Sequence, residues 1–309
     1  MLNFQSNVLL ADYTTFKIGG PADHFVIVNQ SEETLEALRW AQEQHLRVFV
    51  LGGGSNVVFP DEGYRGLVVK LNYQQLNISN EQVTVGAGFI LADLIKETIK
   101  AGLVGLEFAA GIPGSVGGAV VGNAGTYGKD MHDVLDYINY IDIDSLQAKH
   151  MNTTDGDFTY RHSTFKEHSY VVTEVALSLK KGDVEASQKV IDERLATRHA
   201  KHPTEPSAGC IFKNILMDQI DTSKLAEKGL DLKPFEAHNK IPAGFLIDNL
   251  DLKGKTIGGA QVSPKHANYI INTGKATSAD INMLASLIKQ QVRDTYGIQL
   301  QEEVRFVYN

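Results

Sequence analysis

The sequence predicts an α+β protein of two domains. Its 309 residues are about twice the length of an average domain, and 43% of them are apolar, which is enough for two buried cores. Strands and helices alternate over the first 180 residues, and the charged break KKGD at 180–183 precedes a second unit. We therefore expect a domain at 1–183, with a subdomain split near 70–80, and a second domain at 184–297. The last strand, 298–309, is a candidate to return to the first domain.

Hydrophobic periodicity gives the elements of the first domain. Residues 31–45 form a helix that Ser31 caps, with acidic residues in its first turn. Residues 91–102 form a second helix, because apolar side chains recur at helical spacing and Gly102 follows as a stop. Runs rich in β-branched residues predict strands at 25–28, 47–51 and 82–88, and an antiparallel group within 134–180 with its clearest members at 137–143 and 170–179.

The second domain begins with a helix near 186–200. The segment 201–209, KHPTEPSAG, has the composition of a linker or an active-site loop. A helix at about 280–296 stops at Gly297, and 298–308 reads as a long closing strand. Alternation along that strand places Glu303 on the face opposite its apolar residues, so that solvent or a cleft could receive the side chain.

Charge and cysteine content exclude several classes of function. The chain carries 29 basic and 37 acidic side chains, a net charge of −8, which is a poor basis for binding nucleic acid. Its one cysteine excludes an internal disulfide framework and a multi-cysteine metal site, and we expect no metal. The N-terminus lacks a basic segment followed by a long apolar run, so we expect no signal peptide and a cytoplasmic location.

The segment 108–128 contains no charged residue over 21 positions, and glycines at 114, 118 and 122 give the spacing at which transmembrane helices pack. Its composition nevertheless argues against a membrane span. Seven glycines together with Pro113 and Asn123 leave too few strongly apolar side chains. We therefore predict a glycine-rich loop region, and no membrane partner.

Three glycine-rich segments lie in the first domain, at 18–20, 51–56 and 111–128. Glycine allows backbone N–H groups to approach a ligand closely, as in loops that hold phosphates. The segment 51–56 is not a Rossmann fingerprint, because the β-branched run VVF follows it where a helix is required, and no P-loop pattern occurs. Taken singly, each segment is typical of tight turns; the three together favour a dinucleotide held by backbone amides.

Several polar residues are candidates for chemistry, each with a simpler alternative. Arg161, in YRHS, could bind an anion or could be an exposed arginine in a salt bridge. Cys210, in SAGCIFKN, could be a functional thiol or a small buried apolar residue. The stretch between Asp251 and Asp280 has four lysines, His266 and no acid. It offers an anionic ligand a favourable field, or it is a solvated basic face.

Taken in order, these segments resemble the UDP-N-acetylenolpyruvoylglucosamine reductase (UDP-N-acetylmuramate dehydrogenase) family over nearly the whole chain. The motifs are TTFKIGGPA, LGGGSNVV, GIPGSVGGAVVGNAGTYG, YRHSTFK, SAGCIFKN, GGAQVSPKHANYIIN and EEVRF. Each motif alone is weak, whereas the ordered set is specific. The short stretch between YRHS and SAGC is similar to the compact type II class, which lacks an extra tyrosine-bearing loop.

The resemblance implies a vanillyl-alcohol-oxidase-type (PCMH-like) FAD-binding domain of two α+β subdomains, followed by a smaller α+β substrate domain. It implies an NADPH-dependent enzyme that reduces UDP-N-acetylglucosamine enolpyruvate to UDP-N-acetylmuramate during peptidoglycan precursor synthesis, and we expect a monomer. By resemblance, the catalytic residues are Arg161, Cys210 and Glu303, and the substrate-binding residues are Lys213, Asn214, Gln261 and His266. The FAD-binding residues would be Gly19, Gly20, Gly52, Gly53, Gly54, Ser55, Asn56, Gly111, Ile112, Pro113, Gly114, Ser115, Gly117, Gly118, Asn123, Ala124 and Gly125.

The chemistry of an enolpyruvyl ether explains why those catalytic side chains are needed. Hydride transfer from flavin N5 to C3 leaves negative charge at C2 that spreads onto the carboxylate, so a cation and a hydrogen-bond donor must stabilise it. Arg161 is a fixed cation, and Glu303 could donate if its surroundings keep it protonated. Cys210 would then donate a proton to C2 as a general acid.

Many family members carry serine at the position of Cys210, and a thiol, with a reference pKa of about 8.5, releases its proton more readily than an alcohol. Two alternatives remain open at this stage. One is another FAD oxidase or dehydrogenase of the same fold that uses oxygen, and the other is a non-catalytic protein that binds flavin or a UDP-sugar.

Overall fold

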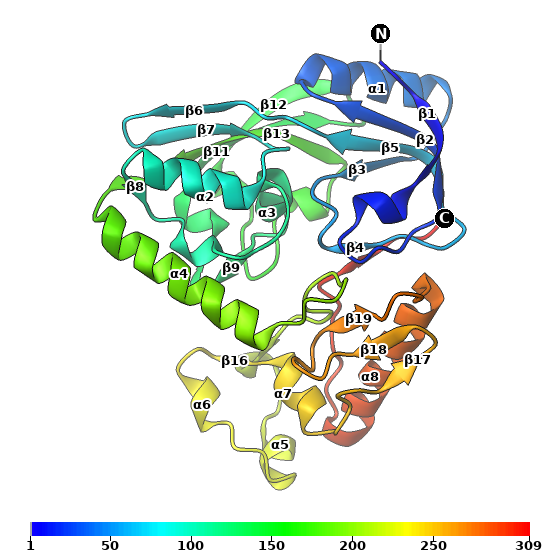
Figure 1. Cartoon of the computed structure of the whole chain (residues 1–309), viewed down its shortest axis with the longest axis vertical. Coiled ribbons are helices and arrows are strands. Elements are labelled where there is room, and N and C mark those ends of the chain that lie inside the picture. The colour runs from blue at the N-terminus through cyan, green and yellow to red at the C-terminus, as the bar shows by residue number, and fades with distance from the viewer. Residues whose placement is uncertain (1) are drawn as a thin grey trace. The chain divides into compact units, whose positions relative to one another are not determined.

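The computed structural model describes residues 2–309 and divides them into two compact units (Figure 1). Unit 1 holds the N-terminal stretch through Val8, Ala22–Gly54 and Tyr64–Ala200, whereas unit 2 holds Leu9–Pro21, Ser55–Gly63 and Lys201–Asn309. These boundaries differ from the expected division at 183/184. The residues at 184–200 belong to unit 1, and two short segments from the first 183 residues belong to unit 2.

Local contacts explain both differences. The helix that follows residue 183 stays with unit 1 because its Ile191 is buried in that core and its Ser187 hydroxyl donates a hydrogen bond to Glu107. The segments 9–21 and 55–63 are joined to each other by a hydrogen bond from the Gly20 N–H to the Pro60 carbonyl, at 2.9 Å. Both then pack in the core of unit 2 through residues such as Phe16 and Val58.

Unit 1 contains the two largest sheets formed by residues 2–309. The first has the strand order β1-β2-β5-β3, and its strands β2, β5 and β3 are parallel, with β5 between the other two. Its elements are β1 (Gln5–Leu9), β2 (Pro21–Val28), α1 (Ser31–Glu43), β3 (Val48–Leu51) and β5 (Tyr64–Leu71). The predicted cap of α1 is wrong. Gln30 precedes the helix, Ser31 is its first helical residue, and the carboxylate of Glu33 accepts the Asn29 N–H at 2.6 Å instead.

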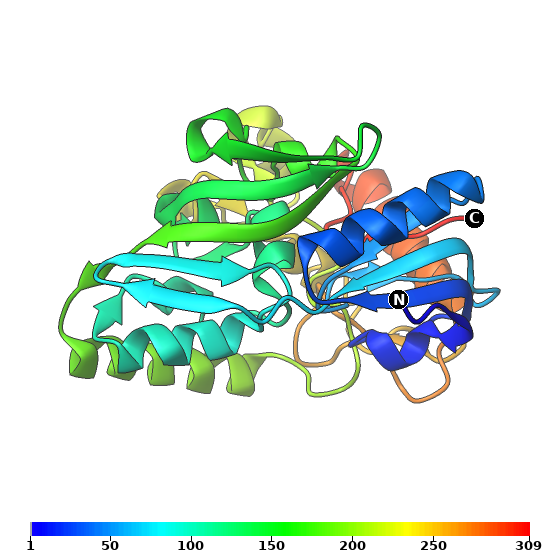
Figure 2. The same cartoon turned by 90° about the horizontal axis from the view of Figure 1, so that it is seen from above.

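The second sheet of unit 1 is antiparallel, in the order β12-β11-β13-β7-β6. It starts at Leu76, directly after the first sheet ends at Leu71. The helices α2 and α4 lie on one side of it (Figures 1 and 2). The elements are β6 (Leu76–Ser79), β7 (Gln82–Gly86), α2 (Leu91–Lys100), α3 (Val116–Val121), β11 (Leu135–Asp142), β12 (Gln147–Asn152), β13 (Tyr170–Ser178) and α4 (Val184–Lys201).

Short elements complete unit 1, and they include the predicted glycine-rich loop region. Two-residue strand pairs are formed by β8 (Leu103–Val104) with β14 (Lys180–Lys181) and by β9 (Gly125–Thr126) with β10 (Lys129–Asp130). Within 108–128 the longest helix is α3, with six residues, so the loop prediction is confirmed. No helix among residues 2–309 combines the length and the apolar content that crossing a bilayer requires.

Unit 2 is built from short strands and helices around α8. The predicted C-terminal helix is confirmed as α8 (Ser278–Tyr296), which ends at Gly297 in the left-handed conformation, with φ 73°. The other elements are β4 (Val57–Val58), β15 (Ile215–Leu216), α5 (Ser223–Glu227), α6 (Lys233–Glu236), β16 (Lys240–Ile241), α7 (Ala243–Asp248), β17 (Thr256–Ile257), β18 (Ala260–Val262), β19 (Ile270–Asn272) and β20 (Arg305–Phe306).

The long closing strand predicted at 298–308 is wrong, because only β20, Arg305–Phe306, is regular strand. The chain changes partners along this stretch. The Lys213 N–H donates to the carbonyl of Gln301, and the Glu303 N–H donates to that of Ile211. Beyond this point β20 pairs in parallel with β4 instead. Each change of partner interrupts the ladder that one long strand would need.

Candidate active site

In unit 1, the glycine segments 51–54 and 111–118 meet backbone to backbone. A Cβ atom on Gly53 would lie 2.5 Å from the Cα of Gly114, and one on Gly52 would lie 2.6 Å from the Oγ of Ser115. Side chains are therefore excluded at both positions by packing, and the loop after β3 can present main-chain N–H groups without obstruction. This cradle fits the predicted role of these residues in holding a dinucleotide.

A lysine outside the predicted site, Lys70, reaches the start of this loop. Lys70, near the end of β5, is paired in register with Leu51 of β3, and its Nζ donates a hydrogen bond of 2.5 Å to the carbonyl of Gly52. Burial lowers the pKa of this ammonium. The sequence carried one signal for it, because Lys70 is a lone charge between the apolar run Leu67–Val69 and Leu71.

Other predicted cofactor residues in unit 1 serve the fold directly. The buried side chain of Asn123 donates to the Thr159 carbonyl at 2.9 Å and accepts the His132 N–H at 3.1 Å. A Cβ on Gly125 would lie 2.2 Å from the Lys129 carbonyl in the β9–β10 pair. Local packing therefore explains why asparagine and glycine stand at these two positions.

Arg161 is held by the same region of unit 1. Its Nη2 donates to the Gly125 carbonyl at 2.9 Å, and its Nη1 donates to the Asn123 carbonyl at 3.5 Å. The guanidinium lies over the ring of Tyr160, with 5.3 Å between the guanidinium carbon and the ring centroid. The backbone of Arg161 is left-handed, with φ 57°. A cation fixed in this way can orient a carboxylate.

Unit 2 contains the other two predicted catalytic residues, and the structure places their backbones side by side. Cys210 is half-buried and forms an antiparallel bridge with Tyr269. The next residue, Ile211, accepts the Glu303 N–H at 2.8 Å. Residues 210 and 303 are about ninety positions apart in the sequence, so this hydrogen bond is what brings their two segments of main chain together.

The predicted cofactor residues of unit 2 have structural partners as well. A Cβ on Gly20 would lie 2.1 Å from the Asp61 carbonyl, and Gly19 adopts φ 135°, so both glycines are required by the turn itself. The side chain of Asn56 donates to the Glu303 carbonyl at 3.0 Å. Asn56 therefore helps to fix the main chain that carries a predicted catalytic residue.

The predicted substrate residues also lie in unit 2. The Asn214 side chain accepts the Ala243 N–H at 3.3 Å, and the Gln261 amide donates to the Gly254 carbonyl at 3.3 Å. The His266 Nδ1 accepts the Asn268 N–H at 3.2 Å, so neutral His266 carries its proton on Nε2. Lys213 is half-buried and follows Cys210 by three residues. In the acid-free stretch, Lys253 pairs with Asp248 at 2.7 Å.

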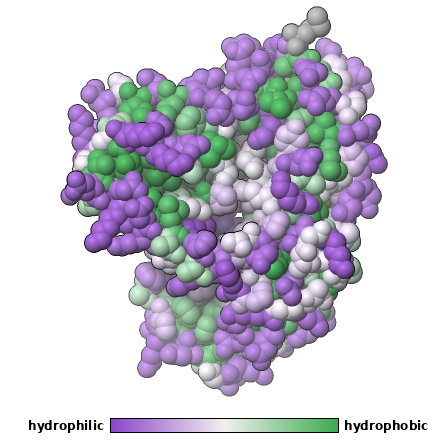
Figure 3. Space-filling view, viewed as in Figure 1, coloured by the Kyte–Doolittle hydropathy of each residue, from purple (hydrophilic) through white to green (hydrophobic). Residues whose placement is uncertain are grey.

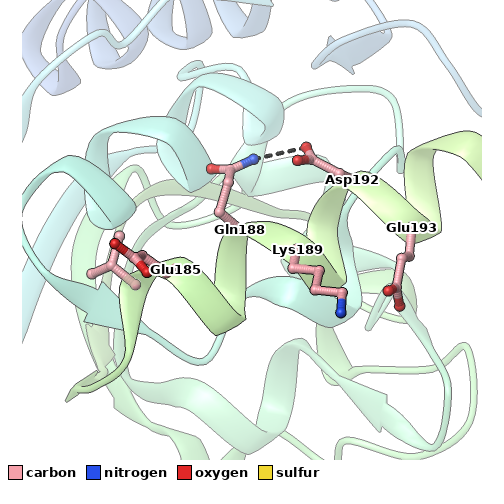
Figure 4. Close-up of a pocket in the computed structure, with 6 residues that line it drawn as sticks. Glu185, Gln188, Lys189, Asp192 and Glu193 are labelled. Atoms are coloured by element: carbon pink, nitrogen blue, oxygen red, sulfur yellow. Dashed lines mark hydrogen bonds between the residues drawn. The ribbon is translucent and has the colours of Figure 1, made fainter.

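Two surface hollows in unit 1 contain none of the predicted catalytic or substrate residues. One, of about 600 Å³, follows the exposed side of α4, where the Gln188 amide donates to Asp192 at 2.9 Å (Figure 4). The other, of about 350 Å³, is lined by residues such as Phe108 and Tyr127. Apolar residues gather in patches over the part of unit 1 that carries α2 and α4 (Figure 3).

Two ranges of the chain match the profiles of known domain families. Residues 22–145 match the profile of an FAD binding domain. Residues 201–307 match that of the C-terminal domain of UDP-N-acetylenolpyruvoylglucosamine reductase. Together with the glycine cradle, the first match defines a flavoprotein, in the class of FAD-dependent oxidoreductases. The second match gives the family more narrowly.

Relatives cover nearly the whole chain. The UDP-N-acetylenolpyruvoylglucosamine reductase of Heliobacterium modesticaldum is 36% identical over 96% of this chain and 88% of its own length. The protein of the same name from Listeria innocua is 37% identical over 97% and 94%. The crystal structure of the Thermus caldophilus reductase covers 100% of both chains with a TM-score of 0.79 and 32% identity. The chain belongs to the UDP-N-acetylenolpyruvoylglucosamine reductase family, and the expected fold class is confirmed.

Proposed function

We propose that the chain catalyses the NADPH-dependent reduction of UDP-N-acetylglucosamine enolpyruvate to UDP-N-acetylmuramate, a step in the synthesis of peptidoglycan precursors. The observation that carries the proposal is the hydrogen bond from the Glu303 N–H to the Ile211 carbonyl, because it joins the two segments of unit 2 that hold the predicted catalytic residues Cys210 and Glu303. Family membership supports the substrate, since the relatives are named for its reduction. Bound FAD would supply the two-electron reducing step.

The three predicted catalytic side chains have distinct tasks in this proposal. Arg161 binds the substrate carboxylate with the guanidinium that two backbone carbonyls and Tyr160 hold in place. The Glu303 carboxyl group would supply the hydrogen-bond donor that the developing negative charge requires. Cys210 donates its thiol proton to C2 and takes a proton from solvent before the next turnover.

The glycine cradle is the part of the chain that fits FAD. The closely packed glycines at 52, 53 and 114 leave no room for side chains, which is the arrangement expected where main-chain N–H groups hold phosphates. The lysines of the acid-free stretch other than Lys253, and the Nε2–H of His266, are suited to the diphosphate and the other acceptor groups of a UDP-sugar.

The stoichiometry of the reaction and the mass of its product test the proposal. Under anaerobic conditions, one NADPH should be consumed for each enolpyruvate substrate, and the product should be heavier by two hydrogens. NADPH consumption that needs oxygen and ignores the UDP-sugar would contradict the proposal and favour an oxidase of the same fold.

A further inference from the structure

Lys70 is a partly buried ammonium without an acidic partner. Its Nζ donates to the Gly52 carbonyl at 2.5 Å, and no ion pair involves this lysine among residues 2–309. The pKa of Lys70 is lowered by burial, and no neighbouring charge contributes to that shift. Lys96 and Lys100 differ in this respect, because they pair with acids on the surface of α2.

Such a charge is costly unless an anion accompanies it. Removing an ammonium from water is unfavourable, and one carbonyl oxygen compensates only part of the loss. A neutral side chain that reaches the same carbonyl would avoid this cost. The position of Lys70 therefore indicates a negatively charged group that arrives from outside the chain.

The place of the ammonium narrows the identity of that anion. Lys70 is aligned with Leu51, the last residue of β3, and it bonds the first glycine of the loop that follows. The next glycine, Gly53, packs against Gly114 and leaves the loop backbone bare. An ammonium next to a loop whose main-chain N–H groups are not covered by side chains is a typical binding site for phosphate oxygens. Lys70 also lies within the segment that matches the FAD binding domain.

We infer that Lys70 supplies the positive charge that pairs with the diphosphate of FAD, an inference that rests on the FAD binding in the proposed function. The substrate carries a diphosphate of the same chemistry in its UDP portion. The location of Lys70 in the 22–145 segment favours the diphosphate of the cofactor, and the experiment separates the two sources.

The test compares four full-length variants by titration with FAD, followed by flavin fluorescence. Lys70→Met removes both the charge and the hydrogen bond, whereas Lys70→Gln keeps an N–H donor but removes the charge. Lys70→Arg keeps the charge. Lys96→Met, on the exposed surface of α2, is the matched control.

We expect Lys70→Met and Lys70→Gln to raise the Kd for FAD by about 10- to 100-fold, the range for a charge-assisted bond to phosphate. Lys70→Arg should recover most of the affinity, and Lys96→Met should match the unsubstituted protein. Titration with UDP should give the same Kd for all variants. The melting temperature of the flavin-free Lys70→Met protein should not fall, although its increase on addition of FAD should be smaller.

Several results would overturn the inference. If Lys70→Gln binds FAD like the unsubstituted protein, the lysine acts as a hydrogen-bond donor to the loop and not as a charge. If both neutral variants lose stability without flavin, its role is structural. If only UDP binding changes, the diphosphate is that of the substrate. An unsubstituted protein that takes up no FAD would contradict the proposed function as well, so the two failures are distinguishable.

Discussion

The packing of Gly53 against Gly114 allows a direct test of the glycine cradle. In Gly53→Ala, the new Cβ would lie 2.5 Å from the Cα of Gly114, whereas carbon atoms normally approach to about 3.5–4.0 Å. One backbone must therefore move by about 1 Å. Overpacking of this kind typically lowers the free energy of unfolding by about 1–3 kcal/mol. For a unit of this size, each kcal/mol lowers the melting temperature by roughly 2–4 °C.

The measurement is urea unfolding of the flavin-free protein, followed by far-ultraviolet circular dichroism. Gly118→Ala is the matched control, because its Cβ would lie 3.4 Å from the nearest atom, the Oγ of Ser115, in ordinary contact. Its helical position also favours alanine. We expect a lower midpoint for Gly53→Ala and an unchanged or higher one for Gly118→Ala. Equal midpoints for Gly53→Ala and the unsubstituted protein would refute the steric argument.

Three further predictions concern unit 2. Cys210→Ser should keep substantial activity, whereas Cys210→Ala should stop product formation and still allow NADPH to bleach the flavin; near-normal turnover by Cys210→Ala would exclude the thiol as proton donor. Asp61→Ala should lower the free energy of unfolding by about 1–2 kcal/mol in a denaturant titration. The reason is that the Asp61 carboxylate accepts two hydrogen bonds from Ser278 at the start of α8, from the N–H at 2.9 Å and from the hydroxyl at 2.8 Å. Glu62→Ala, at an exposed position, is the control, and an equal loss of stability in both variants would contradict the role of Asp61. Hydrogen bonds from the Gly259 and Thr277 N–H groups lower the pKa of Asp280, so its contribution to stability is present above the ordinary aspartate pKa of 3.8 and is lost as the pH falls through the lowered value. The difference in unfolding midpoint between the unsubstituted protein and Asp280→Asn should therefore be largest near neutral pH and shrink in acid, and a constant difference would show that ionisation of Asp280 is not involved.

Local patterns in the sequence were sufficient for the regular elements. The apolar spacing of α2 and α8 and the glycines after them predicted both helices, and β-branched runs predicted β2, β3 and β13. The rejection of a Rossmann motif at 51–56 also agrees with the structure, since β4 follows the loop directly. These features depend on neighbours within a few residues, which a single sequence displays.

Features that depend on distant partners were not predictable in the same way. The segment 298–308 has the alternation of a strand, but its partners change from Ile211 to Asn56, and no local pattern records that change. The helix α4 reads as the start of the second domain until Ile191 is seen in the core of unit 1. Lys70 was overlooked because its significance lies in the Gly52 carbonyl, 18 positions away.

For the candidate site residues too, the sequence displays the motif, whereas only the structure displays the contacts with distant residues. Motif order indicated Cys210 and Glu303, but only the backbone pairing of Ile211 with Glu303 shows how the two segments that carry them come together. Asn123 and Gly125 were selected for a cofactor, and their hydrogen bonds and packing show a structural task that the motif does not reveal. A motif shared across a family therefore contains residues needed for the fold as well as residues needed for the chemistry, and the motif alone does not separate them.

If the proposed function is correct, reduced flavin on this chain is reoxidised by the enolpyruvate substrate. The most direct measurement mixes the anaerobic, NADPH-bleached protein with UDP-N-acetylglucosamine enolpyruvate and records the flavin absorbance. We expect the yellow colour to return within the time of a catalytic turnover, without oxygen. Flavin that stays bleached until air is admitted would contradict the proposed function.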